Sequence, residues 1–404
     1  MTAALLLGVI ASLVWAVRGD GLRDRFLRAL VAFGVVLVIS TELLGSLRLL
    51  SRLPLTAMWS AVLAAALARG ATRKGSRDFA LPFFRLDAVI VISSLGVVTI
   101  LGVTAVVAAF SPPNSADAMA YHMPRVVYWA EQASVRFFPT PYLNQLMLQP
   151  LAEYLMLHTY VLSGGDHFVN FVQWFASLAS MIGVSGVAKL LGAEPRGQAV
   201  AALFCATLPA GILASSGAKN DYWLAMWLVT AVYFALQFAE SRRLQDAAWL
   251  GGALGLALLT KGTAYLFAPW PVAAVLMLRM RARPKRLVAG LLIAAGVALG
   301  LNAMQYARNY RLSGSVLGFD SAQGDGVFRW RNETFGWRET ASNAARHLSE
   351  QLGDRSERWN EGVYSAVIAM HKGLGLDVND PRTTFRGSTF SPTRNANHEA
   401  DGAK

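Results

Sequence analysis

Long apolar runs constrain this chain more than any other feature of the sequence. Residues 88–110 form an uncharged run of about 23 residues, long enough to cross a hydrocarbon core of roughly 30 Å at 1.5 Å per residue. Similar or shorter runs cover 3–17, 29–47, 53–68, 170–191, 198–215, 222–239, 247–260, 264–278 and 287–304. Of all residues 54% are hydrophobic and only 15% are charged, against roughly 25% charged in soluble domains. The sequence therefore predicts an all-α polytopic membrane protein.

The net charge of +12 is interpreted from where lysine and arginine lie along the chain. A basic chain could bind nucleic acid, but here the basic residues fall in short clusters between the apolar runs, as the positive-inside rule produces. We therefore expect no nucleic-acid partner, and we place the clusters on the cytoplasmic side of a plasma (bacterial inner) membrane. They lie at 18–28, 69–85, 242–243 and 279–286. Arg48 and Arg52 disagree, because this topology puts them outside.

The same topology gathers the polar segments on the outer face, at 111–165, 218–221, 261–263 and 305–404. Both ends of the first outer loop, 111–167, must then be outside, so its apolar piece 151–162 cannot cross the bilayer. We expect that piece to lie along the interface, with Tyr154 and Tyr160 as anchors. The predicted parts are about three helices in 1–87, a transmembrane core in 88–304 and a polar outer tail in 305–404.

The first candidate site lies in SPPNSADAMAYHMPR, residues 111–125, directly after the run that ends at Phe110. Asp117 is the only acid between Asp87 and Glu131. A carboxylate at the membrane surface beside Tyr121, His122 and Arg125 could act as an acid or base on a polar group presented there. The alternative is an N-cap, in which Asp117 accepts hydrogen bonds from a helix that starts at Ala118.

A second acid, Asp221, opens the helical run in KNDYWLAMW, just after Lys219. N-capping is again the alternative. Two acids at helix ends on one face would also suit a divalent cation, or a diphosphate-like substrate served by an acid or base. The single cysteine, Cys205, excludes an intrachain disulfide and a thiolate metal cluster.

Two basic residues on the outer face admit two interpretations each. Lys261 of TKGT and Arg308 of ARNYRLSGSVLG both follow apolar runs. A basic side chain at a helix end often extends to the interface without further function, but at headgroup depth it could also hold a phosphate. No phosphate-binding loop, dinucleotide fingerprint, nucleophile elbow or zinc motif is found in the sequence.

Four motifs in this order give the chain a family resemblance. They are NSADAMAYHMPR with the downstream QPLAEYLM, then KNDYWLAMW, TKGT and ARNYRLSGSVLG, within about residues 88–320. Together they resemble the GT-C superfamily of membrane glycosyltransferases, nearest the protein O-mannosyltransferase-like and lipid A aminoarabinose transferase-like bacterial proteins. The resemblance implies a GT-C-like transmembrane helix bundle with outer-face juxtamembrane helices and a polar C-terminal tail.

The resemblance also implies roles for single residues. Asp117 would be the catalytic acid of the first outer loop, as a general base or a metal-linked carboxylate, and Asp221 would support the same cavity. Relatives often have Lys-Pro-Pro-Leu where this chain has Gln149 and Pro150, so Lys261 becomes the better candidate for the donor phosphate, with Arg308 behind it. The predicted substrate-binding residues are Tyr121, His122, Arg125, Gln149, Glu153, Lys219, Lys261 and Arg308.

The implied activity is transfer of a hexose or pentose from a polyprenyl-phosphate donor to a lipid, glycan or protein acceptor on the extracytoplasmic face. A divalent cation, Mg²⁺ or Mn²⁺, held by Asp117 and Asp221 would be its cofactor, although two carboxylates can also work without an ion. Relatives continue into further membrane helices, so we expect a truncated chain. The alternative functions are a multi-pass transporter or flippase for a lipid-linked substrate, and a membrane protein without chemistry.

Overall fold

The computed structural model describes residues 2–72, 87–280, 284–318, 336–354, 356–381, 383–384 and 389–390. These residues form helices and connections, with no strand among them. The chain divides into two compact units. Unit 1 comprises Met1–Thr140, Asn144–Thr207 and Ala214–Gly318, and unit 2 comprises Pro141–Leu143, Leu208–Leu213 and Phe319–Lys404.

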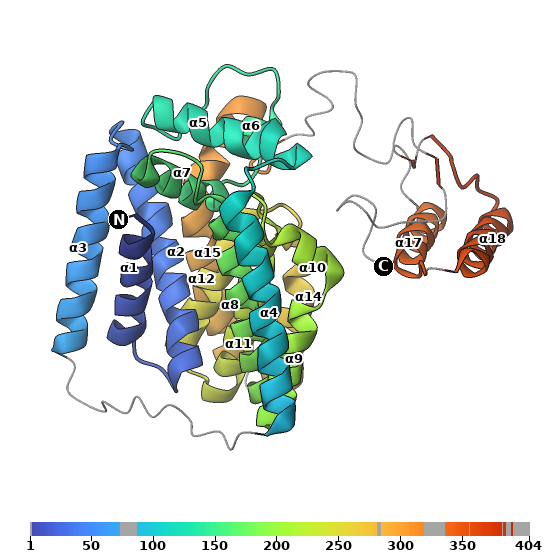
Figure 1. The fold of residues 1–404 in the computed structure, drawn as a ribbon, viewed down its shortest axis with the longest axis horizontal. Helices are drawn as coiled ribbons and strands as arrows, with labels where there is room; N and C mark the ends of the chain where they lie inside the picture. Colours follow the sequence, from blue (N-terminus) through green and yellow to red (C-terminus); the bar gives the residue numbers. More distant parts are fainter. Residues whose placement is uncertain are drawn as a thin grey trace. The chain divides into compact units, whose positions relative to one another are not determined.

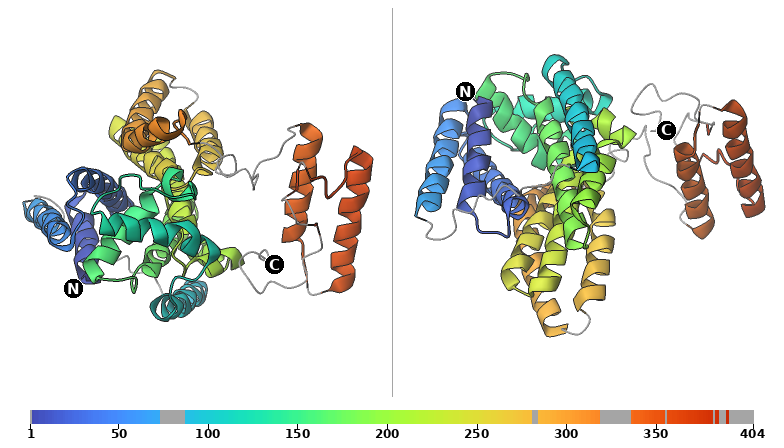
Figure 2. Two further views of the ribbon diagram at one scale, coloured as in Figure 1. Left: turned by 90° about the horizontal axis from the view of Figure 1, so that it is seen from above. Right: turned by 60° about the horizontal axis from the view of Figure 1, so that its bottom comes forward.

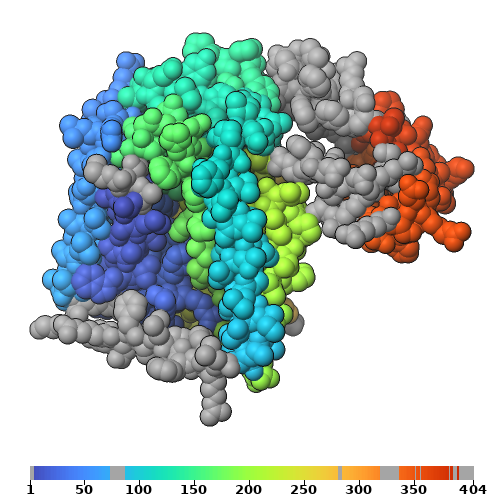
Figure 3. Space-filling view, viewed as in Figure 1, coloured from blue at the N-terminus to red at the C-terminus, as the bar shows by residue number. Residues whose placement is uncertain are grey.

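The long helices of unit 1 confirm the prediction of an all-α polytopic membrane protein. Six described helices are long and apolar enough to cross a membrane, namely α2 (Leu22–Ser46), α3 (Arg52–Ala71), α4 (Ala88–Phe110), α8 (Asn170–Leu190), α11 (Asp221–Ser241) and α15 (Pro284–Ser313). They pack with α1 (Thr2–Ala16), α9 (Pro195–Ala206), α12 (Leu244–Thr260), α13 (Ala264–Phe267) and α14 (Pro269–Met280). In Figure 3, α4 lies on the visible surface of the bundle, and its exposed Ile92, Leu95 and Val98 suit a lipid-facing helix.

Prolines interrupt two of the predicted apolar segments. The segment 198–215 divides into α9 and α10 (Pro209–Ala214), and the segment 264–278 divides into α13 and α14, which begins at Pro269. Both breaks lie at a proline, Pro209 or Pro269, which lacks the amide hydrogen and cannot continue the hydrogen-bond ladder of the preceding helix. The last apolar segment, in contrast, continues as α15 to Ser313, so Arg308 lies within this helix rather than after it.

Shorter elements lie across one end of the bundle (Figure 1). They are a π-helical turn η1 (Ala118–His122), α5 (Met123–Glu131), α6 (Asn144–Met147) and α7 (Leu151–Ser163). As expected, α7 does not run along the bundle, but Tyr154 is not the interfacial anchor that the sequence predicted. Tyr154 is fully buried, because α7 is enclosed by α1, α2, α3, α5, α8 and α12.

A buried histidine joins α7 to the helices before residue 88. Nε1 of Trp59 donates to Nδ1 of His158 at 3.1 Å, and Nε2 of His158 lies 3.0 Å from Oγ1 of Thr41. Burial lowers the pKa of His158 to about 3, so the ring is neutral and its Nε2–H donates to Thr41. The first three helices thus hold α7 in place.

Helices α12 and α15 pack so closely that their backbones are in contact. The side facing α15 carries Gly251 and Gly255, which meet Ala294 and Ala298. Small residues four apart let two membrane helices approach closely. Nδ2 of Asn302 closes the crossing with a hydrogen bond of 2.9 Å to the carbonyl of Gly255.

Unit 2 contains α17 (Trp337–Gln351) and α18 (Glu357–Leu374), which run side by side in both views of Figure 2. Oγ of Ser342 on α17 lies 2.7 Å from Nε2 of His371 on α18, and both residues are buried. Nη1 of Arg346 donates to the carbonyl of Val378 at 3.0 Å. These contacts give unit 2 a small core of its own.

The α12–α15 crossing yields a stability prediction. In Gly251→Ala, the added Cβ would lie 2.6 Å from the Cα and carbonyl oxygen of Ala294, which are backbone atoms and cannot rotate away. We expect a lower thermal midpoint in detergent, corresponding to about 1–3 kcal/mol of overpacking. Gly300→Ala on α15 is the matched control, because its Cβ would meet nothing within 4 Å. Equal midpoints for the two variants would contradict this packing.

Candidate functional site

Asp117 is not a helix cap. Its backbone is already helical, at φ −66° and ψ −41°, and its side chain makes no capping hydrogen bond. Oγ of Ser115 accepts from the amide of Ala118 instead, at 3.3 Å. The N-cap interpretation is therefore wrong, and the half-buried carboxylate of Asp117 is available for other contacts.

Tyr121 connects the two acids that the sequence singled out. It is 8% exposed and follows Asp117 by one helical turn, in the π-helical turn η1. Burial raises the pKa of Tyr121 above its usual range, and the negative charges of Asp117, Glu153 and Asp221 raise it further. Asp117 and Asp221 therefore act on one phenol, although more than 100 residues separate them in the chain.

Asp221 is held by two lysines. Its Oδ1 accepts from Nζ of Lys261 at 2.5 Å, and its Oδ2 lies 3.5 Å from Nζ of Lys219. The N-cap position belongs to Asn220, so the capping interpretation is wrong for Asp221 as well. Lys261 remains 33% exposed while it makes this contact. Asp221, Lys219 and Lys261, each a predicted site residue, thus lie together in the structure.

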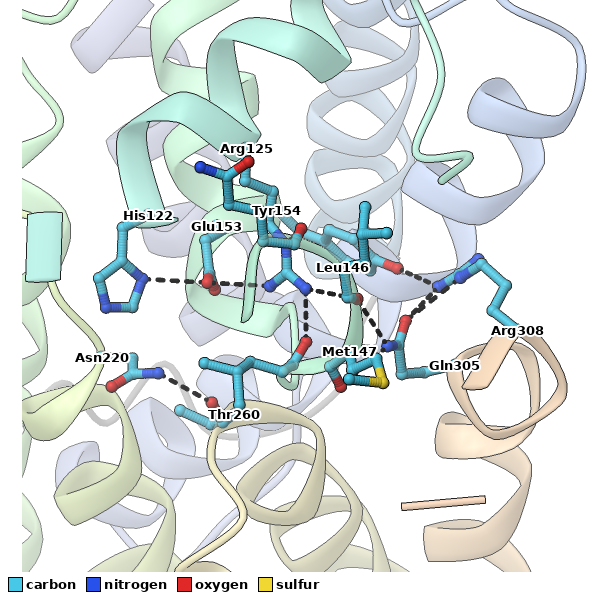
Figure 4. Close-up of polar contacts among 12 residues, drawn as sticks. His122, Arg125, Leu146, Met147, Glu153, Tyr154, Asn220, Thr260, Gln305 and Arg308 are labelled. Atoms are coloured by element: carbon cyan, nitrogen blue, oxygen red, sulfur yellow. Dashed lines mark hydrogen bonds and ion pairs between the residues drawn. The ribbon is translucent and has the colours of Figure 1, made fainter. Parts of the chain in front are cut away.

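The TKGT turn reaches the first outer loop as well as α11. Nδ2 of Asn220 donates to the carbonyl of Thr260 at 3.2 Å, which ties the start of α11 to the end of α12 (Figure 4). A Cβ placed on Gly262 would lie 3.6 Å from Oε1 of Gln149. Gln149 therefore lies beside the turn that carries Lys261.

Three other predicted binding residues form a closed network (Figure 4). Oε1 of Glu153 accepts from Nδ1 of His122 at 3.0 Å and from Nη1 of Arg125 at 3.1 Å. Arg125 also donates to the carbonyls of Gln145, Leu146 and Leu148, at 2.7, 2.7 and 2.6 Å. All three side chains of the network are fully buried. A substrate in this conformation cannot touch Arg125 or Glu153, whose role is to shape the loop.

The charges of this network balance. Burial acts to raise the pKa of Glu153, but His122 and Arg125 outweigh it and the net shift of the pKa is downward. Glu153 is therefore ionised and compensates the buried guanidinium. Two opposite charges can be buried at low cost when they pair with each other and the remaining N–H groups of the arginine also find acceptors.

Unsatisfied polar atoms surround this network. Nε2 of His122, Oε2 of Glu153 and Oδ1 of Asn220 are buried and make no hydrogen bond within the described part of the chain. Such atoms are uncommon in proteins and call for a partner such as an ordered water or a ligand hydroxyl. Of the predicted set, His122 thus keeps a free ring nitrogen next to Tyr121, with ring centroids 4.2 Å apart.

Arg308 is bound to an acid that the sequence did not connect with it. Its Nη1 and Nη2 donate to the two oxygens of Glu42, each at 2.7 Å, and Nη2 also donates to the hydroxyl of Tyr154 at 2.8 Å. Tyr154 in turn donates to Glu42 at 2.5 Å. The predicted phosphate contact at Arg308 does not fit this geometry, because a carboxylate already takes the bidentate face of the guanidinium.

The structure adds Glu42, Tyr154 and Asn220 to the predicted residues. Glu42 had a signal in the sequence, since it is the only obvious acid in the middle of an apolar run. Tyr154 was assigned to the interface by its aromatic character, and nothing local in the sequence distinguishes an interfacial tyrosine from this buried one.

The donors present do not fit the predicted Mg²⁺ or Mn²⁺ site. Within the described ranges, no group of three or more His, Cys, Asp and Glu side chains is close enough to hold a metal ion. Two ammonium groups already compensate Asp221, and they would repel a divalent cation placed on that carboxylate.

The buried network yields a prediction for Glu153→Gln. Removing this charge leaves Arg125 buried and uncompensated, which costs about 3–5 kcal/mol, so the thermal midpoint should fall at pH 7. Because the folded pKa of Glu153 lies below its unfolded value of about 4.3, its contribution is present above that pH and is lost on acidification. The variant should therefore lose less stability than the wild type as the pH falls from about 5 to about 2, through the folded pKa of Glu153.

Glu131→Gln is the matched control, since Glu131 is exposed at the end of α5. If Glu153→Gln had the same thermal midpoint and the same loss of stability at low pH as this control, the ion pair would contribute nothing to stability.

Comparison with known proteins gives one family. The sequence model of the family described as dolichyl-phosphate-mannose-protein mannosyltransferase matches residues 149–303, about two fifths of the chain. The matched part contains Gln149, Glu153, Asp221 and Lys261, and it excludes Asp117 and Arg308. Searches of curated proteins and of solved structures gave no match. With the helices long enough to cross a membrane, the family match supports a GT-C-like membrane glycosyltransferase.

Proposed function

We propose that this chain transfers a sugar from a polyprenyl-phosphate donor to an acceptor, with Asp117 as the general base. The proposal rests on the Asp221–Lys261 ion pair and on the Tyr121 phenol, whose pKa both Asp117 and Asp221 raise, at one end of unit 1. This end combines an accessible carboxylate with accessible positive charge, which are the two groups that the reaction needs.

Lys261 is the proposed contact for the donor phosphate. An ammonium group has three hydrogen-bond donors, and one of them is taken by Asp221 at 2.5 Å. Its partial exposure leaves the others free to reach a phosphate, while Asp221 fixes the position of the side chain. Lys219, on the other oxygen of Asp221, adds positive charge to the same place. Gln149 lies on the opposite side of Gly262 as a neutral hydrogen-bonding group.

Asp117 is suited to remove the acceptor proton. In the proposed step the acceptor oxygen attacks the anomeric carbon, its proton passes to Asp117, and the bond from that carbon to the phosphate oxygen breaks with its electrons on the phosphate. The lysines stabilise the charge that develops on the leaving phosphate. Tyr121, which is 8% exposed, is placed to orient a hydroxyl group of the sugar, while the fully buried His122 packs against its ring.

The reaction face follows from the topology of the chain. Asp221 and Lys261 lie at the end opposite to the basic connection at Arg242 and Arg243, because α11 leads from Asp221 to that connection and α12 leads back to Lys261. The positive-inside rule supports our proposal that the site is on the extracytoplasmic face of the plasma membrane.

The proposal covers several substrates. The description of the matched family names a dolichyl-phosphate mannose donor, so a polyprenyl-phosphate hexose is the first donor to test, followed by a pentose. The acceptor is a lipid, a glycan or a protein. We also propose that no metal ion is needed, since Lys261 and Lys219 supply the positive charge next to Asp221.

The proposal predicts the outcome of a transfer assay with radiolabelled polyprenyl-phosphate sugar in membranes. At equal expression, Asp117→Asn should reduce transfer by roughly 10²–10⁴-fold, because it keeps the shape of the side chain and removes the base. Asp166→Asn, in the connection between α7 and α8, is the matched control and should transfer at the wild-type rate. Addition of a chelator should leave wild-type transfer unchanged.

Three results would count against the proposal. Equal transfer by Asp117→Asn and Asp166→Asn would show that Asp117 is not the general base. Loss of wild-type transfer in the chelator would overturn the metal-free mechanism. A wild-type chain that moves labelled lipid across the membrane without transferring sugar would be a flippase.

A further inference from the structure

A cavity lies at the end of unit 1 opposite to the proposed active site. It has a volume of about 1030 Å³ and is lined by the start of α2 and by parts of α4, α8, α9 and α11. Helix α11 relates the two sites, since Asp221 is its first residue and Ser241, which lines the cavity, is its last. A helix of this length separates its ends by roughly 30 Å. The cavity is therefore not part of the transfer site.

One arginine that lines this cavity has no side-chain partner among the described residues. Arg25 lines the cavity and is 9% exposed, and its enclosed Nε makes no hydrogen bond. No acceptor for the rest of its guanidinium is found among the described residues. An anion in the cavity would give this guanidinium the acceptor and the opposite charge that the described residues do not supply.

The neighbouring arginines on α2 show that pairing is the rule at this end. Nη2 of Arg23 donates to Oε1 of Gln198 at 2.6 Å, and its Nη1 donates to the carbonyl of Ser185 at 3.0 Å. Arg28 bridges Asp24 and Asp246, both at 2.9 Å. Only Arg25 among these three lacks a described acceptor, and it lines the cavity.

The other groups around the cavity favour an anion. Lys189 and Arg243 line it with exposed, positively charged side chains. Asp24 is compensated by Arg28, and it also accepts from the hydroxyl of Tyr233 at 3.2 Å. The remaining acids that line the cavity, Asp20 and Glu240, are exposed, so water and salt screen their charge.

The cavity walls are largely apolar. Leu22, Ile90, Leu190, Ala199 and Ala202 all line it. A free inorganic anion would leave these walls unused, whereas an amphiphile would place its chain along them. The cavity also lies at the end where the basic clusters predict the cytoplasmic leaflet, which carries anionic lipids.

We infer that this cavity binds the phosphate group of a membrane lipid, with Arg25 as its buried hydrogen-bond donor and Lys189 and Arg243 at the opening. The inference is independent of the proposed sugar transfer. It assigns Arg25 a ligand where the described chain offers no acceptor.

Lipid binding to the delipidated, detergent-purified full chain tests this inference. Native mass spectrometry would measure the affinity for dioleoyl phosphatidic acid, with dioleoylglycerol as the probe that lacks phosphate and inorganic phosphate as the competitor that lacks the chains. The variants are Arg25→Gln, and Ala199→Phe, which fills the cavity from α9 without altering Arg25. Arg18→Gln is the matched control, since Arg18 is an exposed arginine at the same end that does not line the cavity.

We expect phosphatidic acid to bind the wild type and Arg18→Gln equally, and Arg25→Gln and Ala199→Phe at least about tenfold more weakly. Dioleoylglycerol should bind at least about tenfold more weakly than phosphatidic acid.

Equal affinity in all four proteins would overturn the inference, and so would equal affinity for the two lipids. If inorganic phosphate displaced the lipid at equal concentration, the site would be one for a free anion and not for a lipid. Ala199→Phe keeps the test valid if Arg25→Gln does not fold.

Discussion

The buried ion pair between Arg125 and Glu153 is the interaction on which the candidate site depends. Arg125 sits inside the first outer loop and donates to three carbonyls of residues 145–148, so the loop folds around its guanidinium. Glu153, at the start of α7, supplies the compensating charge and receives His122 on the same oxygen. These contacts fix the turn that carries Asp117 and Tyr121. The loop is thus a rigid part of the site, although it lies outside the long helices.

Two further ion pairs have contrasting accessibility. Glu42 and Arg308 are largely enclosed, and Tyr154 contributes to both partners, so this pair ties α2 to α15 and leaves little room for a ligand. Asp221 and Lys261 are each about one-third exposed, so their pair can exchange a partner at low cost. The difference in exposure is what separates a structural pair from one that can receive a phosphate.

The helices before residue 88 contribute more than the sequence indicated. No function could be predicted for them, because none of their residues belongs to a motif. In the structure, Thr41 and Trp59 bind the neutral ring of His158, and Glu42 binds Arg308. All of these contacts are made to α7 or α15, the elements that border the site. Their role is to hold the end of the bundle in shape.

The sequence predicted the helical architecture well, because apolar length and proline positions are local properties. It also put Asp221, Lys219 and Lys261 on one face of the membrane, because two predicted membrane crossings separate their short loops. It could not show that Arg308 would bind Glu42 or that Tyr154 would be buried. Those outcomes depend on which helices become neighbours, and hydropathy alone carries no information about that choice. The two N-cap interpretations were wrong for a different reason. Serine and asparagine are as common at N-caps as aspartate, and here Ser115 and Asn220 take those positions instead of Asp117 and Asp221.

The most direct test of the central claim is a cryo-EM structure of the full chain with a non-cleavable phosphonate analogue of a polyprenyl-phosphate sugar. The account predicts the phosphonate oxygens at about 3 Å from Nζ of Lys261, with the anomeric carbon facing Asp117 and the Glu42–Arg308 pair intact. A phosphonate bound to Arg308 with Glu42 displaced, or a sugar remote from Asp117, would contradict it.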